Sequence, residues 1–275
     1  MGKKISEYRT ELMGIAILWV LWFHTQMRFE NDFIHLFKML GYGGVDIFFF
    51  VSGLGIYRSL EKNDDALSFY KRRIIKLMPA YLPLLMVWMI LQMVKEMPVN
   101  LLGFCIGNIT GLALWARNAP HFNWYIQSLI VFYGIAPIIK KMLDRYNKRG
   151  LWIGLVISFI VGPVFWCNNI LMAVSRLPIF IIGMYCGKYV SSEKKVTVKQ
   201  EITLYGMALV GVCMIALCIL KFPVVLSDYG MWWYPFVFII PGFCMLLVRI
   251  LEIVKFVGGG GAFTKAKHPY WHSIS

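Results

Sequence analysis

Residues Leu12–Gln26 have the sequence LMGIAILWVLWFHTQ, in which His24 is the first polar side chain after a run of apolar ones. Such a run in a helix suits the bilayer core, which takes about 20 apolar residues. Lipid offers no hydrogen bonds, so backbone that crosses it must pair within its own segment, and this favours helices over strands. Counting flanking residues that extend the shorter runs, we predict eight spans: Leu12–Gln26, Tyr42–Ile56, Leu77–Val94, Trp124–Ile139, Leu151–Cys167, Pro178–Val190, Ile202–Leu220 and Trp232–Leu247.

The composition of the whole chain supports an all-α integral membrane protein. Of 275 residues, 59% are hydrophobic and 15% are charged, whereas a soluble domain carries about 25% charged residues. The formal net charge of +14 does not indicate nucleic acid, because the basic residues lie in the links between apolar runs. With the N-terminus in the cytoplasm, inner segments hold 22 Lys and Arg and outer segments 6, as the positive-inside rule requires. A bacterial plasma membrane is the expected location.

Two segments and the cysteines carry less information. Leu101–Trp115 is a weaker apolar stretch, and its glycines favour a re-entrant or surface-lying segment over a full span. Residues 1–256 form the expected membrane domain, whereas 257–275 are an atypical polar tail, which we interpret as a truncated or frameshifted end. The six cysteines lie in or beside apolar runs without a CxxC pair or metal-ligand spacing, so we expect apolar packing and no metal site.

His24 is the first candidate for chemistry, because a titratable residue within a span is costly and usually faces a cavity or partner. It can act as a general base or sit in an interfacial belt with Trp19 and Trp22. Arg9 lies 15 residues earlier, about 60° away around a helix, so one face can carry both, with Arg9 at the inner rim. Asp46 lies near the start of the second span, at the level of His24. Its carboxylate can orient the histidine, or it can simply be stabilised by the dipole at the N-terminus of its helix.

Two further groups of polar residues flank the spans. Arg72, Arg73 and Lys76 precede the third span on the inner side, where they can bind a phosphorylated ligand such as coenzyme A or anchor to lipid headgroups. On the outer side, the fourth span is preceded by His121 and Asn123 and begins at Trp124. These three can meet a hydroxylated substrate or anchor the helix at the interface.

Five sequence blocks together resemble, in order, the acyltransferase 3 family of multi-pass membrane acyltransferases. The blocks are YRTELMGIAILWVLWFH (Tyr8–His24), GYGGVDIFFFVSG (Gly41–Gly53), FYKRRIIKLMPAY (Phe69–Tyr81), FNWYIQSLIVFYGIAP (Phe122–Pro137) and RLPIFIIGMYCGKY (Arg176–Tyr189). The resemblance covers about the first two-thirds of the chain. It implies an O-acyltransferase that takes acyl, commonly acetyl, from cytoplasmic acyl-CoA to a hydroxyl of an extracytoplasmic saccharide or lipid-linked saccharide, with no permanently bound cofactor.

The family's histidine corresponds to His24, and its inner Arg-x-x-Arg pair corresponds to Arg73 and Lys76. The chain departs from the family at Met13, where many members have arginine or lysine, at Lys76, and in having eight expected spans instead of ten. Arg9 is the nearest basic substitute for the residue at Met13. Two alternatives remain open: a non-enzymatic transporter of saccharides or small molecules, and an inactive truncated relative.

Overall fold

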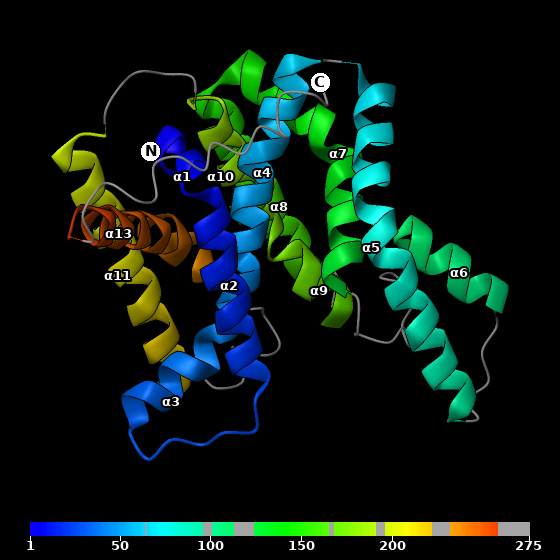
Figure 1. The fold of residues 1–275 in the computed structure, drawn as a ribbon. Helices are drawn as coiled ribbons and strands as arrows, with labels where there is room; N and C mark the ends of the chain where they lie inside the picture. Colours follow the sequence, from blue (N-terminus) through cyan, green and yellow to red (C-terminus); the bar gives the residue numbers. More distant parts are fainter. Residues whose placement is uncertain are drawn as a thin grey trace.

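The computed structural model describes residues 1–63, 65–95, 101–112, 124–164, 168–190, 196–221 and 232–257. In these ranges the chain is helical and has no strand (Figure 1). The elements are α1 (Gly2–Glu7), α2 (Arg9–His24), α3 (Asp32–Met39), the 3-10 turn η1 (Leu40–Gly43), α4 (Gly44–Lys62), α5 (Ala66–Val94), α6 (Leu101–Thr110), α7 (Trp124–Tyr146), α8 (Lys148–Val164), α9 (Asn168–Val174), α10 (Leu177–Gly187), α11 (Val198–Lys221) and α13 (Phe236–Val257).

A helix forms at each of the eight predicted spans, and the all-α membrane fold is confirmed. Six segments of the described chain have both the length and the hydropathy of a membrane span: Asp32–Lys62, Ala66–Val94, Trp124–Tyr146, Ile170–Gly187, Val198–Lys221 and Phe236–Val257. The other two predicted spans correspond to α2 and α8, which have 16 and 17 residues. A helix of 16 residues is about 24 Å long, so α2 alone is somewhat shorter than a bilayer core of about 30 Å.

The weaker apolar stretch forms α6, a helix of 10 residues that is too short to cross a bilayer. The prediction that this stretch does not form a full span is therefore confirmed for Leu101–Thr110. The predicted polar tail falls almost wholly outside the described residues, since α13 ends at Val257.

Glycines allow α4 to pack closely against two neighbouring helices. A side chain at Gly53 would overlap the carbonyl oxygen of Phe180 in α10, and one at Gly183 would overlap that of Phe50 in α4. On the α2 side, a Cβ at Gly44 would lie 2.6 Å from the carbonyl oxygen of Ala16. Close backbone approach at glycines is typical of packed membrane helices, and α4 contributes many residues to the buried core.

Ion pairs join the N-terminal helix to two helices far along the sequence. Lys4 of α1 lies 2.7 Å from Glu252 of α13, and Arg249 of α13 pairs with both Glu252 and Glu201 of α11. These groups are partly exposed, so each pair contributes little alone, but together they hold α1, α11 and α13 in register.

Candidate active site

The two ends of α2 carry the two polar groups that the sequence singled out. Arg9 is the first residue of this helix and His24 is the last. Fifteen residues of helix separate their backbones by about 22 Å. They therefore belong to two different sites, as expected for an inner-rim arginine and a histidine near the opposite end.

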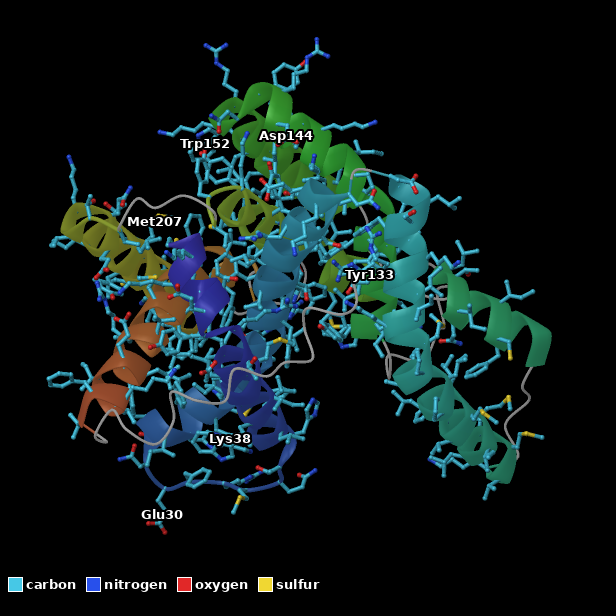
Figure 2. All side chains as sticks on the ribbon, turned by 45° about the horizontal axis from the view of Figure 1, so that its top comes forward. Glu30, Lys38, Tyr133, Asp144, Trp152 and Met207 are labelled. Atoms are coloured by element: carbon cyan, nitrogen blue, oxygen red, sulfur yellow. The ribbon has the colours of Figure 1, made fainter. Side chains whose placement is uncertain are left out.

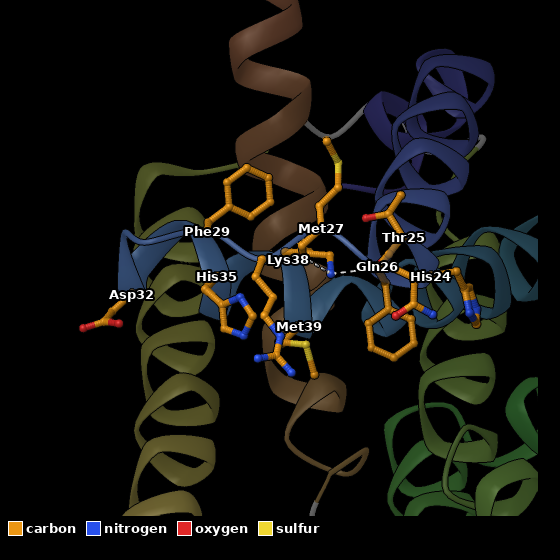
Figure 3. A pocket seen from close by; sticks show the side chains of 11 residues that line it. His24, Thr25, Gln26, Met27, Phe29, Asp32, His35, Lys38 and Met39 are labelled. Carbon is orange, nitrogen blue, oxygen red and sulfur yellow. Dashed lines mark hydrogen bonds between the residues drawn. The ribbon is translucent and has the colours of Figure 1, made fainter.

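His24 lines an open pocket formed by the link after α2 and by α3, which lies across the end of α2 (Figure 1). The pocket volume is about 610 Å³, within the range of small-molecule sites. Figure 3 shows His24 and His35 on opposite sides of Lys38. The His24 side chain is exposed, and its aromatic neighbour is Phe23, with ring centroids 5.0 Å apart. An exposed imidazole beside a pocket can accept a proton from a hydroxyl bound there.

Asp46 does not orient His24 in this structure, because its carboxylate faces another part of the bundle. The face of α4 that packs on α2 includes Gly44, and Asp46, two residues later, lies about 200° around the helix. Its Oδ1 is 3.5 Å from Nε of Arg176, and both side chains are 1% exposed. Of the two roles predicted for Asp46, orienting the histidine is therefore not seen, and its carboxylate forms a buried ion pair with Arg176 instead.

Arg176 is the residue of this region that sequence reasoning missed. Its guanidinium carbon lies 5.0 Å from the ring centroid of Trp124 and 4.9 Å from that of Trp233, so the cation is held between two indoles. Its Nη1 also donates a hydrogen bond of 2.8 Å to the carbonyl oxygen of Met172. A signal was present in the sequence, since an arginine directly before the apolar run from Leu177 to Cys186 needs a partner at that depth.

At the other end of α2, Arg9 and Arg73 lie close enough to interact electrostatically, and both interact with Tyr133 of α7. The guanidinium of Arg9 covers Gly55 of α4, whose missing side chain leaves room for it. The guanidinium carbon of Arg73 lies 5.3 Å from the ring centroid of Phe69 and 5.7 Å from that of Tyr133. Two helices besides α2, namely α5 and α7, thus contribute side chains to one basic cluster, which is defined by Arg9, Arg72, Arg73, Tyr125 and Tyr133.

Within the described part of the chain, Arg9 and Arg73 of this basic cluster have no carboxylate partner, whereas Arg72 interacts electrostatically with Asp65. Nε of Arg9, Nε of Arg73 and Nη2 of Arg72 are buried donors without a hydrogen-bond acceptor there. Unmatched cationic donors of this kind are costly unless an anion accepts from them. The cluster is therefore suited to a polyanionic ligand such as a nucleotide-linked phosphate. Figure 2 shows Tyr133 and Lys38 well apart, so the cluster and the pocket are separate sites.

The remaining predicted residues are only partly placed. Lys76 is exposed one turn further along α5 than Arg72 and Arg73. Trp124 lies against Arg176, whereas His121 and Asn123 lie outside the described residues. Among the residues that the structure describes, no cluster of His, Cys, Asp or Glu has the geometry to hold a metal ion.

Comparison with known proteins gives one match. A family model described as an acyltransferase domain matches residues 12–257, which is most of the chain. Neither a curated protein nor a solved structure matches the sequence significantly. The matched range includes His24, the Asp46–Arg176 pair and the arginines of α5, and Arg9 lies just before it.

Proposed function

Because the chain belongs to the acyltransferase 3 family of membrane acyltransferases, we propose that it transfers an acyl group from cytoplasmic acyl-CoA to a hydroxyl of an extracytoplasmic saccharide. Acetyl is the proposed acyl group, and the plasma membrane is the proposed location. The observation that carries this proposal is the basic cluster, in which Arg9 and Arg73 offer buried donors with no carboxylate partner in the described chain.

The proposed donor end is the end of the molecule where α2 begins. Coenzyme A is a polyanion, and arginine binds phosphate through two parallel hydrogen bonds. The aromatic side chains of Phe69 and Tyr133 restrict the Arg73 guanidinium by cation–π contact, so less rotamer freedom is lost when phosphate binds. Placing this end in the cytoplasm agrees with the excess of Lys and Arg in the inner links.

The proposed acceptor end is the pocket beside His24. The imidazole of His24 would take the proton from the acceptor hydroxyl as its oxygen attacks the acyl carbonyl carbon. The bond from that carbon to the sulfur of coenzyme A would break, and the imidazolium would return the proton to the leaving sulfur. A side chain that acts as general base contributes typically about 10²- to 10⁴-fold to the rate. The exposure of His24 beside a pocket of about 610 Å³ supports this role.

The test is transfer of radiolabelled acetyl from acetyl-CoA to membrane saccharide in vesicles that carry the protein. We expect His24→Ala to lower kcat by about 10²-fold or more. We expect Arg73→Ala to raise the KM for acetyl-CoA by about 10- to 100-fold, because a hydrogen bond to a charged group is lost. Arg145→Ala is the matched control. Arg145 is an exposed arginine that stacks on Tyr146 and lies outside the basic cluster.

Three results would count against the proposal. Transfer undiminished by His24→Ala would remove the histidine from the mechanism. Saccharide movement across the vesicle membrane without any acyl-CoA would instead favour a transporter. If Arg73→Ala and Arg145→Ala change the KM for acetyl-CoA equally, the donor is attracted by the general charge of the inner surface and not by the basic cluster.

A further inference from the structure

The pocket beside His24 contains a buried cation that the proposed chemistry does not use. Lys38 of α3 is 4% exposed and lies in the pocket wall. Its Nζ donates hydrogen bonds of 2.8 Å to the carbonyl oxygen of Thr25 and 2.7 Å to that of Met27. Both acceptors are neutral, and within the described chain Lys38 has no carboxylate partner. A buried ammonium without a counter-ion leaves a positive potential at the wall it lines.

The hydrogen bonds of Lys38 also fix the shape of the pocket. Thr25 and Met27 belong to the link that leaves α2 directly after His24, so Lys38 ties this link to α3. An ammonium has three N–H donors, and two are used on the link. The remaining N–H is available to a group bound in the pocket that Lys38 lines together with His24 (Figure 3).

Other polar groups around the pocket add to the positive character. Arg28 lines it with an exposed side chain and has no ion-pair partner among the described residues. Nδ1 of His35 is buried without a hydrogen-bond partner in the same part of the chain. Asp32 also lines the pocket, but Figure 3 shows it at the far edge, with its carboxylate directed away from Lys38.

The amphipathic character of α3 explains why these groups face the pocket together. Asp32, His35 and Lys38 recur every three residues and share one face of the helix. The opposite face is apolar, with Phe33 77% exposed and Phe37 stacked on Trp19 at 5.1 Å. An apolar face exposed at the end of a transmembrane bundle is suited to lie in the membrane interface, so the polar face looks toward the pocket.

We propose that this pocket binds an anionic group of the acceptor, a carboxylate or a phosphate on the saccharide, with Lys38, Arg28 and His35 as its ligands. The inference rests on the proposed function in placing the acceptor beside His24. A carboxylate or phosphate oxygen would accept from the free N–H of Lys38 and from Arg28, which would hold a neighbouring hydroxyl near the imidazole of His24. The acceptor is therefore an acidic saccharide or a sugar–phosphate chain.

The test measures binding without any acyl transfer. Purified protein in phosphatidylcholine nanodiscs is equilibrated with radiolabelled oligogalacturonate and glycerol 3-phosphate, and with their neutral counterparts oligogalactose and glycerol. We expect at least one acidic probe to bind about tenfold or more tightly than its neutral counterpart, with a preference that weakens as salt is raised. Equal binding of acidic and neutral probes in both pairs would overturn the inference.

Variants separate the pocket from general surface charge. Lys38→Met and Arg28→Gln should each reduce the acidic preference, and Arg28→Gln retains the hydrogen bonds of Lys38 that shape the pocket. Lys95→Met removes an exposed charge outside the pocket and should leave the preference intact. A preference unchanged in both pocket variants, or equally reduced by Lys95→Met, would refute the assignment.

A lipid headgroup is the other source of the same chemistry. If hydrogen exchange of the pocket residues is slower in phosphatidylglycerol than in phosphatidylcholine nanodiscs, while neither acidic probe binds in phosphatidylcholine, the site belongs to a lipid and the inference fails. The proposed function survives such a result, because acetyl transfer to a neutral saccharide that depends on His24 would still be observed. Conversely, acidic binding without any acetyl transfer would support this pocket and count against the transferase.

Discussion

Breaking the buried pair between Asp46 and Arg176 from one side should destabilise the protein far more than removing both partners. Each side chain is 1% exposed, and their nearest charged atoms are 3.5 Å apart. Asp46→Leu would leave the guanidinium of Arg176 between two indoles with no counter-ion, and Arg176→Met would leave a buried carboxylate. Asp46→Leu/Arg176→Met would remove both charges and fill the space with apolar groups.

The magnitude follows from the geometry. At an effective dielectric constant of about 20, two unit charges about 3.5 Å apart attract by roughly 5 kcal/mol. Removing one partner of a buried pair costs about 3–5 kcal/mol in measured cases, whereas apolar replacement of both is often neutral. Nε of Arg176 and Oδ2 of Asp46 have no hydrogen-bond partner in the described chain, so the attraction is electrostatic. We expect each single variant to lose about 3–5 kcal/mol, and the double variant to recover most of it.

The wild type, the two single variants and the double variant form a double-mutant cycle. Equilibrium unfolding in mixed micelles of increasing dodecyl sulfate content, followed by circular dichroism, gives the free energy of unfolding for all four proteins. Arg145→Met is the control for loss of an exposed arginine, and its effect should stay within about 0.5 kcal/mol. A coupling energy of about 5 kcal/mol or more is expected, because the two single losses sum to at least about 6 kcal/mol and the double variant loses little. If the losses of the two single variants simply add in the double variant, the two side chains do not interact and the geometric reasoning is wrong.

Two further predictions use the same unfolding assay. Gly183→Ala should cost about 1–3 kcal/mol through overpacking, because its Cβ would overlap the carbonyl oxygen of Phe50. The control Gly14→Ala should be neutral or stabilising, because nothing lies within 4 Å of its Cβ. Equal effects of the two substitutions would contradict the close approach of α4 and α10. Lys4→Met should cost about 1 kcal/mol or less, because its pair with Glu252 is partly exposed. That loss should shrink in 1 M salt, and a larger, salt-independent loss would show that the pair is not screened.

The positions of the helices could be predicted from the sequence because hydropathy is a local property of each segment. Leu12–Gln26 became α2 and Trp124–Ile139 became part of α7 with small shifts at the ends. The stretch around α6 ends at a glycine, since Gly111 has a φ of +78° directly after Thr110, whereas Gly103 and Gly107 lie within the helix. Each of these inferences needs only the apolar content of one window and the thickness of a bilayer.

Partners across the bundle could not be predicted, because they depend on which faces of two helices meet. Asp46 and Arg176 are 130 residues apart, and only the packing of α4 brings them together. The depth of Asp46 suggested His24 as its partner, but the rotation of α4 set by Gly44 directs the carboxylate elsewhere. Lys38 is one of the six Lys and Arg residues of the predicted outer segments, and nothing local shows that its side chain folds back to the link after His24.

The same packing restricts how an acyl group could cross the molecule under the proposed function. The basic cluster and His24 lie at opposite ends of α2, about 22 Å apart by helix length. A direct route between α2 and α4 is closed near the outer end, because the carbonyl oxygen of Ala16 and the side chain of Val20 fill the space at Gly44. The side of α4 that faces α7 is lined by aromatic side chains, since the ring of Phe48 lies 5.9 Å from that of Tyr125. Since Tyr125 also interacts with Arg9, that side is continuous with the basic cluster, and an acyl chain that leaves the cluster meets α7 before it reaches His24.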